Sequence, residues 1–125
     1  MILVVDDEIE IAEVVVDIID QAFPNKICIK VNDPRSAIDI IQNNNIELLI
    51  TDLKMPNYDG TQLIEALREV TNVPVVVMSG FIDEFKDRLK KFDGVLAFEK
   101  PFNHDEFIEK VDSFMAQATE LDIDF

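Results

Sequence analysis

The sequence predicts an α/β fold in which one parallel β-sheet carries helices on both of its faces. Short apolar runs that are typical of strands alternate five times with stretches whose apolar residues recur every three or four positions, which indicates amphipathic helices. This alternation favours a parallel sheet with right-handed crossover connections. The length of 125 residues fits one domain with a single hydrophobic core. We therefore expect five strands and five helices.

The first elements along the chain are a strand, a helix and an edge strand. Residues 2–5 are an apolar run, and an amphipathic helix follows from Glu8 until Pro24 ends it. Residues 26–31 alternate in polarity, which predicts a strand with one solvent-facing side at the edge of the sheet. We interpret Cys28, within this run, as a buried strand residue.

The middle of the chain contains a capped helix, a buried strand and a third helix. Asp33 and Pro34 are typical of a helix start, as N-cap and first-turn residues, and this helix is expected to end near Asn44. Residues 47–51 are apolar enough for a buried strand. The third helix is expected to begin at Gly60 or the residue after it.

The last third of the chain repeats the pattern. Residues 73–78 are almost all apolar, as in strands that are covered on both faces. A mostly charged fourth helix and a fifth strand, residues 95–98, follow. Asn103 is placed to cap the fifth helix, with Glu106 at the capping-box position. The residues expected to face the core are Phe85, Leu89 and Phe92 of the fourth helix and Phe107, Val111, Phe114 and Ala118 of the fifth.

Composition narrows the classes of function. The net charge of −15 opposes binding to nucleic acid and to anionic membranes, so we expect neither as a partner. The apolar runs are too short to cross a bilayer, and the start lacks the pattern of a signal peptide. A single cysteine excludes an internal disulfide and fits a reducing compartment. These features predict a cytoplasmic protein.

Polar side chains follow four of the expected strands, at the point where each strand ends. Asp6 and Asp7 follow the first strand, Asp52 the third, Ser79 the fourth and Lys100 the fifth. The carboxyl ends of parallel strands meet at one edge of the sheet, where α/β proteins bind their ligands. Each residue alone would fit a cap or a surface ion pair. Together they favour a shared site, because apolar strands seldom end in charged residues.

The chemistry of these five side chains points to a phosphoryl group. Three carboxylates about 4 Å apart repel each other by about 4 kcal/mol per pair at an effective dielectric constant near 20, so the site needs a proton or a cation. Oxygen ligands without histidine or thiol nearby favour Mg²⁺ or Mn²⁺. Lys100 and Ser79 can contact phosphoryl oxygens. Asp52 is then the candidate nucleophile.

Four motifs carry a resemblance to a known family. They are VVDDE at Val4–Glu8, ITDLKMPNYDG at Ile50–Gly60, MSG at Met78–Gly80 and EKPF at Glu99–Phe102. Taken in order, they resemble the receiver domain of bacterial two-component response regulators over residues 1 to about 118. The resemblance implies a flavodoxin-like (CheY-like) doubly wound (βα)5 fold with strand order 2-1-3-4-5. We expect a receiver domain at residues 1–119, a short, frayed acidic tail at 120–125 and no output domain.

The resemblance also implies a phosphorylation site and its metal ligands. Asp52 would accept a phosphoryl group from a sensor histidine kinase or a histidine phosphotransfer protein, as one step of a phosphorelay or two-component system. Asp7, Asp52 and the backbone carbonyl of Lys54 would bind Mg²⁺, with Asp6 acting largely through a bound water. Such a domain would catalyse its own phosphorylation and dephosphorylation, although it is primarily a signalling switch and we leave open whether it counts as an enzyme.

The residues around the phosphoryl-binding lysine match those of relatives, except at the position three residues before the lysine. Ser79 and Lys100 would contact the phosphoryl oxygens, and the Lys100–Pro101 peptide bond would be cis. Relatives usually place tyrosine or phenylalanine three residues before the lysine, where the ring swings inward on phosphorylation. Here that residue is Ala97, and Phe98 is expected to point to the opposite face as a core residue. The usual aromatic arm of the switch is missing.

The surface of the fourth helix has two interpretations, and three alternative functions need to be considered. The basic residues of the fourth helix are either a solvated face or a docking surface for an acidic partner, since relatives often signal through helix four, strand five and helix five. They are Lys86, Arg88, Lys90 and Lys91. One alternative is a receiver-like binding module that works without phosphorylation. An aspartyl phosphatase of the haloacid dehalogenase type would need an aspartate where Lys54 stands, and a flavodoxin would need a phosphate loop that the first strand lacks.

Overall fold

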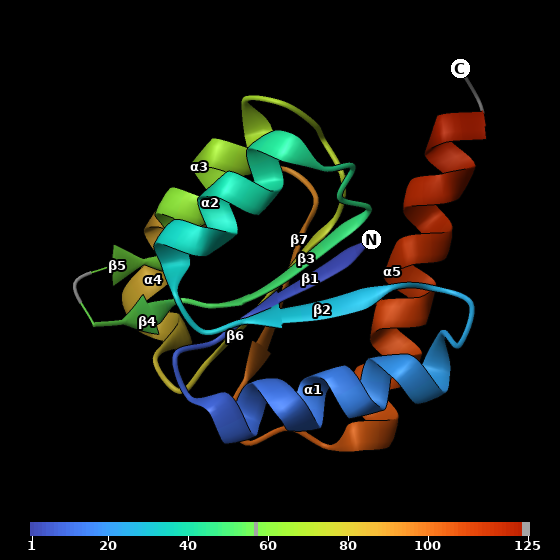
Figure 1. Ribbon diagram of the computed structural model, residues 1–125, viewed down its shortest axis with the longest axis horizontal. Helices are drawn as coiled ribbons and strands as arrows, with labels where there is room; N and C mark the ends of the chain where they lie inside the picture. Colours follow the sequence, from blue (N-terminus) through green and yellow to red (C-terminus); the bar gives the residue numbers. More distant parts are fainter. Residues whose placement is uncertain (57, 124–125) are drawn as a thin grey trace.

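The computed structural model describes residues 1–56 and 58–123. In this part of the chain, a five-stranded parallel sheet lies between two layers of helices (Figure 1). Its strands are β1 (Ile2–Val5), β2 (Cys28–Val31), β3 (Leu48–Asp52), β6 (Val75–Ser79) and β7 (Val95–Glu99). The helices are α1 (Ile9–Ala22), α2 (Pro34–Asn43), α3 (Gly60–Arg68), α4 (Ile82–Leu89) and α5 (His104–Ile123).

The sheet order confirms the predicted topology. The strands lie in the order β2-β1-β3-β6-β7, which is 2-1-3-4-5 when only the strands of this sheet are numbered. Strand β1 lies between β2 and β3 and pairs with both of them. Strand β7 pairs with β6 at the far edge of the sheet. No helix in the described part of the chain is long and apolar enough to cross a membrane.

Two hydrophobic cores lie on opposite faces of the sheet because strand side chains alternate. Leu49 of β3 packs with residues of α2, α3 and α4, whereas Ile50 packs with residues of α1 and α5. All residues of β1, β3 and β6 are buried, as expected for strands that are covered on both faces. Phe98 of β7 lies in the α1–α5 core against Phe102 and Phe107, which confirms its predicted orientation.

The helix caps follow the sequence signals closely. The Asp33 side chain accepts a hydrogen bond from the Arg35 amide at 3.0 Å, and the Asn103 side chain accepts one from the Glu106 amide at 3.1 Å, as predicted. The N-cap of α3 is Asp59, which completes a capping box that the sequence analysis missed. It belongs to a short antiparallel hairpin, β4 (Lys54–Met55) and β5 (Tyr58–Asp59), which was also not predicted.

Three predictions about the edge strand and the fourth helix need correction. Strand β2 begins at Cys28, so Ile27 lies before the strand and is 69% exposed. Cys28 is half-buried rather than fully buried, although burial still raises the pKa of its thiol to about 11. Helix α4 ends at Leu89. Phe92 packs against the core from the following loop, where its amide donates to the Leu89 carbonyl at 3.1 Å.

The expected tail at residues 120–125 is also corrected, because α5 continues to Ile123. The predicted boundary after residue 119 therefore falls inside a helix. Residues 124–125 lie outside the described residues, as does the predicted core position of the Ala118 side chain. In Figure 1, α5 lies beside α1 at its start and extends past the sheet at its end.

Candidate functional site

The five predicted site residues come together at the carboxyl ends of β1, β3, β6 and β7. Asp6, Asp7 and Asp52 each offer a carboxylate oxygen, and these oxygens lie within 4.8 Å of one another. The Lys100 Nζ donates to Asp6 Oδ2 at 3.0 Å and to Asp52 Oδ2 at 3.2 Å. Ser79 is the last residue of β6, and its carbonyl accepts a hydrogen bond from the Lys100 amide at 2.9 Å.

Asp52 is held at the tip of β3 by backbone donors. Its Oδ1 accepts hydrogen bonds from the Leu53 amide at 2.7 Å and from the Lys54 amide at 3.4 Å. Its Oδ2 faces Lys100. Only 6% of the residue is exposed. The strand tip therefore presents one carboxylate, fixed in orientation, next to a cation.

The remaining site residues differ in what they contact. Asp6 is fully buried, and its Oδ1 accepts a hydrogen bond from the Glu8 amide at 3.0 Å. The Ser79 hydroxyl accepts one from the Phe81 amide at 2.9 Å. The Lys54 side chain points away from the acids, toward Glu84 at 3.5 Å and over the Phe81 ring at 4.1 Å. The contact that Lys54 makes with the site is through its backbone amide, which donates to Asp52 Oδ1 at 3.4 Å.

Gly60 is a site residue that the sequence analysis did not single out. Its amide donates to the Leu53 carbonyl at 2.8 Å. An ideally placed Cβ at Gly60 would lie 2.3 Å from the Asp52 carbonyl oxygen. The start of α3 thus passes so close to the end of β3 that only glycine fits. The final glycine of the ITDLKMPNYDG motif was the available signal.

Charge repulsion and burial shape the electrostatics of the site. Burial raises the pKa of Asp52, and the charge of Asp6 adds to the rise, while Lys100 opposes it. Burial and the charge of Asp6 likewise raise the pKa of Asp7. Burial alone would lower the pKa of Lys100, but its hydrogen bond to Asp6 and the charges of Asp52 and Asp6 outweigh that effect and raise it. Three carboxylates and one ammonium leave an excess of negative charge, which fits a divalent cation with oxygen ligands.

The raised pKa of Asp52 predicts that its charge destabilises the folded protein. A carboxyl group with a higher pKa in the folded than in the unfolded chain makes the free energy of unfolding fall as pH rises through that window. We expect Asp52→Asn to raise the free energy of unfolding at pH 7 by about 1 kcal/mol, or the Tm by ~4 °C, in a chelator. The gain should shrink below about pH 4, where the unfolded-state carboxyl is also protonated.

The matched control for this measurement is Asp39→Asn, which removes one exposed acid from α2. Thermal unfolding of both variants and of the wild type would be followed at pH 7 and pH 3.5. An equal rise in both variants would assign the effect to the net charge of the chain. A lower Tm for Asp52→Asn than for the wild type would contradict the prediction.

A doubly wound parallel sheet whose carboxyl edge joins three aspartates, a serine and a lysine defines the class of phosphoryl-accepting signalling domains. The family model described as the response regulator receiver domain matches residues 2–112. The chain therefore belongs to the receiver domain family of response regulators. The Lys100–Pro101 peptide bond is cis, as the resemblance implied.

Sequence relatives and solved structures agree with this family. The transcriptional regulatory protein CpxR of Escherichia coli K12 is 26% identical over 125 residues, which cover 94% of this chain and 50% of CpxR. The chain thus spans about half the length of that relative. The receiver domain of the Francisella response regulator 1452 is 30% identical, with a TM-score of 0.72 over 94% of this chain and 97% of that one. The Vibrio cholerae chemotaxis protein CheY4, at 23% identity, has a TM-score of 0.79 over 90% of this chain and 96% of that one, which shows the shared fold.

Proposed function

We propose that this receiver domain accepts a phosphoryl group on Asp52 from a sensor histidine kinase or a histidine phosphotransfer protein. The observation that carries the proposal is the position of Asp52. It ends a buried strand, its Oδ1 is fixed by backbone amides and its Oδ2 lies 3.2 Å from the Lys100 ammonium. A carboxylate oxygen held in one orientation is suited to in-line attack on phosphorus.

The surrounding side chains support this reaction. An Asp52 oxygen would form a bond to phosphorus as the donor's phosphorus–nitrogen bond breaks, and the donor histidine would leave with a proton. Lys100 would offset the charge of the transferring group and Ser79 would donate to one of its oxygens. To face the phosphoryl group, the Lys100 ammonium would exchange its ion pairs with Asp6 and Asp52 for an ion pair with the phosphoryl oxygens.

Mg²⁺ is the proposed cofactor, with Mn²⁺ as a substitute. Asp6, Asp7 and Asp52 would hold it together with the Lys54 carbonyl, and their oxygens are close enough for one cation. When bound, the metal would supply positive charge to the aspartates and to the phosphoryl oxygens. We propose that the phosphorylated domain then signals by contact with another protein rather than with nucleic acid.

Incubation with acetyl phosphate and Mg²⁺, followed by intact mass measurement, tests this function. We expect one phosphoryl mass increment that requires the metal, is lost in Asp52→Asn and is kept in Asp39→Asn, which carries the same change of charge at an exposed position of α2. Phosphorylation of Asp52→Asn would show that another residue is the acceptor. Failure to bind Mg²⁺ and to accept phosphate from any donor would favour the second candidate, a binding module that acts without phosphorylation.

A further inference from the structure

Three phenylalanine rings pack together around the short segment that carries Lys100. Phe98 comes two residues before the lysine and Phe102 two residues after it, and their ring centroids lie 6.0 Å apart. The ring of Phe107, near the start of α5, lies 4.8 Å from each of them. Favourable aromatic pairs have centroid distances of about 4.5 to 7 Å. We call these three residues the aromatic cluster.

The aromatic cluster belongs to the core on the α1 and α5 side of the sheet. Phe107 is fully buried, Phe98 is 6% exposed, and Phe102 is half-buried in the loop before α5. The residues directly before and after Lys100 are exposed. Packing against the core therefore holds the lysine segment at its two ends and not through its nearest neighbours.

The Lys100 ammonium acts across the edge of the sheet, away from its own strand. Strand β6 lies between β7 and β3, so the lysine side chain crosses the end of β6 to reach Asp52 and Asp6. The Lys100 amide donates to the Ser79 carbonyl at 2.9 Å, which ties the segment to β6. A segment tied at one such point can still rotate about it. The rings at both ends of the segment oppose that rotation.

We propose that the aromatic cluster positions Lys100, because it fixes the direction in which the lysine side chain leaves the end of β7 and so holds the ammonium beside Asp52. Its three rings are positioning residues that act through Lys100. A misplacement of about 1 Å in a group that contacts the reacting atoms can cost about 10²-fold in rate. The effect on phosphorylation rests on the proposed function, whereas the position of the ammonium does not.

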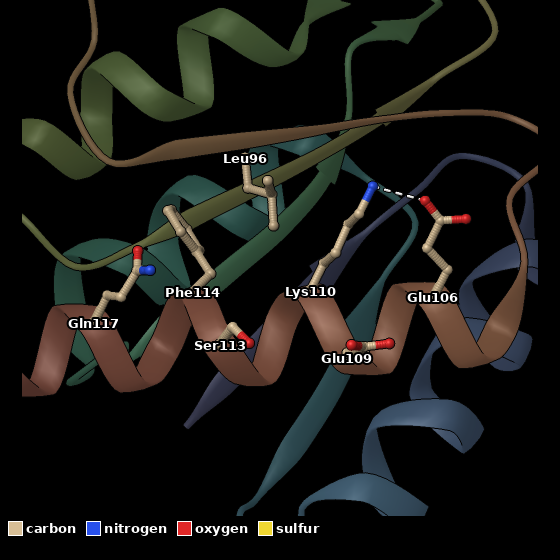
Figure 2. Close-up of a pocket in the computed structure, with 7 residues that line it drawn as sticks. All are labelled: Leu96, Glu106, Glu109, Lys110, Ser113, Phe114 and Gln117. Carbon is tan, nitrogen blue, oxygen red and sulfur yellow. Dashed lines mark hydrogen bonds and ion pairs between the residues drawn. The ribbon is translucent and has the colours of Figure 1, made fainter.

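Phe102→Leu is the variant that tests the aromatic cluster, because Phe102 is its half-buried member and leucine keeps the position apolar. Phe102→Tyr is the conservative counterpart, which keeps the ring. Phe114→Leu is the matched control, since Phe114 packs against the same core about 10 Å along α5 from Phe107. It lines a hollow of about 330 Å³ together with Leu96 (Figure 2).

The first readout is the rate of phosphorylation by acetyl phosphate at saturating Mg²⁺, followed by intact mass. We expect Phe102→Leu to be about tenfold slower than the wild type, and Phe102→Tyr and Phe114→Leu to stay within about twofold of it. In a Lys100→Met background, Phe102→Leu should slow the reaction no further, because the rings act through the ammonium. An equal loss in both backgrounds would overturn the proposal, since it would assign the rings a general structural role.

The second readout does not need phosphorylation. Acetylation of lysines by an N-hydroxysuccinimide ester, followed by peptide mass mapping, measures how often the Lys100 amine leaves its ion pairs. The Lys100 side chain is 18% exposed, and Lys26, at 44%, is the internal reference. We expect Phe102→Leu to raise the acetylation rate of Lys100 relative to Lys26 about fivefold. Phe102→Tyr and Phe114→Leu should leave this ratio unchanged, and an unchanged ratio in Phe102→Leu would overturn the proposal.

The two readouts separate this inference from the proposed function. A wild type without a phosphoryl increment, whose protected Lys100 becomes reactive in Phe102→Leu, would contradict the proposed function and support the positioning role. A phosphorylated wild type that Phe102→Leu matches in both readouts would support the function and overturn the positioning role. Thermal unfolding would set a temperature at which every variant is folded, and Phe114→Leu would show what the loss of one core ring does by itself.

Discussion

Replacing Gly60 by alanine should lower the free energy of unfolding by about 3 kcal/mol. The added Cβ would lie 2.3 Å from the Asp52 carbonyl oxygen and 2.9 Å from the Leu53 Cα, so it would meet backbone rather than a flexible side chain. Alanine is preferred over glycine in a helix by at most about 1 kcal/mol. The steric effect should therefore dominate, and either α3 or the end of β3 must move.

Gly80→Ala is the matched control, because an added Cβ there has no heavy atom within 4 Å. Urea denaturation of the two variants would measure the difference, and we expect Gly80→Ala to stay within about 0.5 kcal/mol of the wild type. A loss of less than about 1 kcal/mol in Gly60→Ala would show that α3 can shift freely from β3. The carboxylate position of Asp52 should be affected as well, because the clash falls on its own peptide group.

The sequence predicted most of the fold because its signals are local. Alternating apolar runs, the Asp33 and Asn103 caps and the polar strand ends each reflect a rule that acts within a few residues. The wrong predictions concern segments whose structure depends on contacts between residues far apart in the sequence. Helix α4 ends before Phe92, and the Phe92 side chain packs against the core on the α2, α3 and α4 side of the sheet. The hairpin β4–β5 is too short for a periodic pattern to reveal.

The candidate site could be predicted as a set of residues but not as a set of contacts. The positions of Asp52 and Lys100 at strand ends predicted that both belong to the site. Their spacing in the sequence did not predict that Lys100 would form ion pairs with both Asp6 and Asp52. The bridging follows from the neighbouring positions of β1 and β3 and from the reach of lysine across the sheet edge. The Arg88–Asp59 pair joins two segments 29 residues apart, and no sequence period encodes it.

The predicted basic face of the fourth helix shows the same limit. Its sequence suggested one positively charged surface. In the structure Arg88 faces Asp59, and Lys86 and Lys90 each lie near an acid of their own helix. What distinguishes this surface is a groove between α4 and β7, about 320 Å³ in volume, whose lining joins these two lysines to apolar residues. Its shape follows from the packing of α4 beside β7, which only the structure reveals.

Lys100→Met should reduce the rate of phosphorylation by acetyl phosphate by about 10²- to 10³-fold. Methionine keeps an apolar stem of similar length but removes the ammonium that lies 3.0 Å from Asp6 and 3.2 Å from Asp52. Both carboxylates are nearly inaccessible to solvent, so their charges would lose their only bonded side-chain cation among the described residues. The free energy of unfolding in a chelator should fall by about 3 kcal/mol as a result.

The rate and the stability losses of Lys100→Met can be separated. Time courses of intact mass at saturating Mg²⁺, at a temperature where the variant is fully folded, isolate the chemical step. Lys110→Met is the matched control, because Lys110 is exposed on α5 and pairs only with Glu106 among the ion pairs of the described chain. A variant that loses stability but keeps a rate within about twofold of the wild type would restrict Lys100 to holding Asp6 and Asp52 together. Loss of rate in a folded, Mg²⁺-binding variant would instead place the ammonium on the phosphoryl group in the transition state, where its charge acts most strongly.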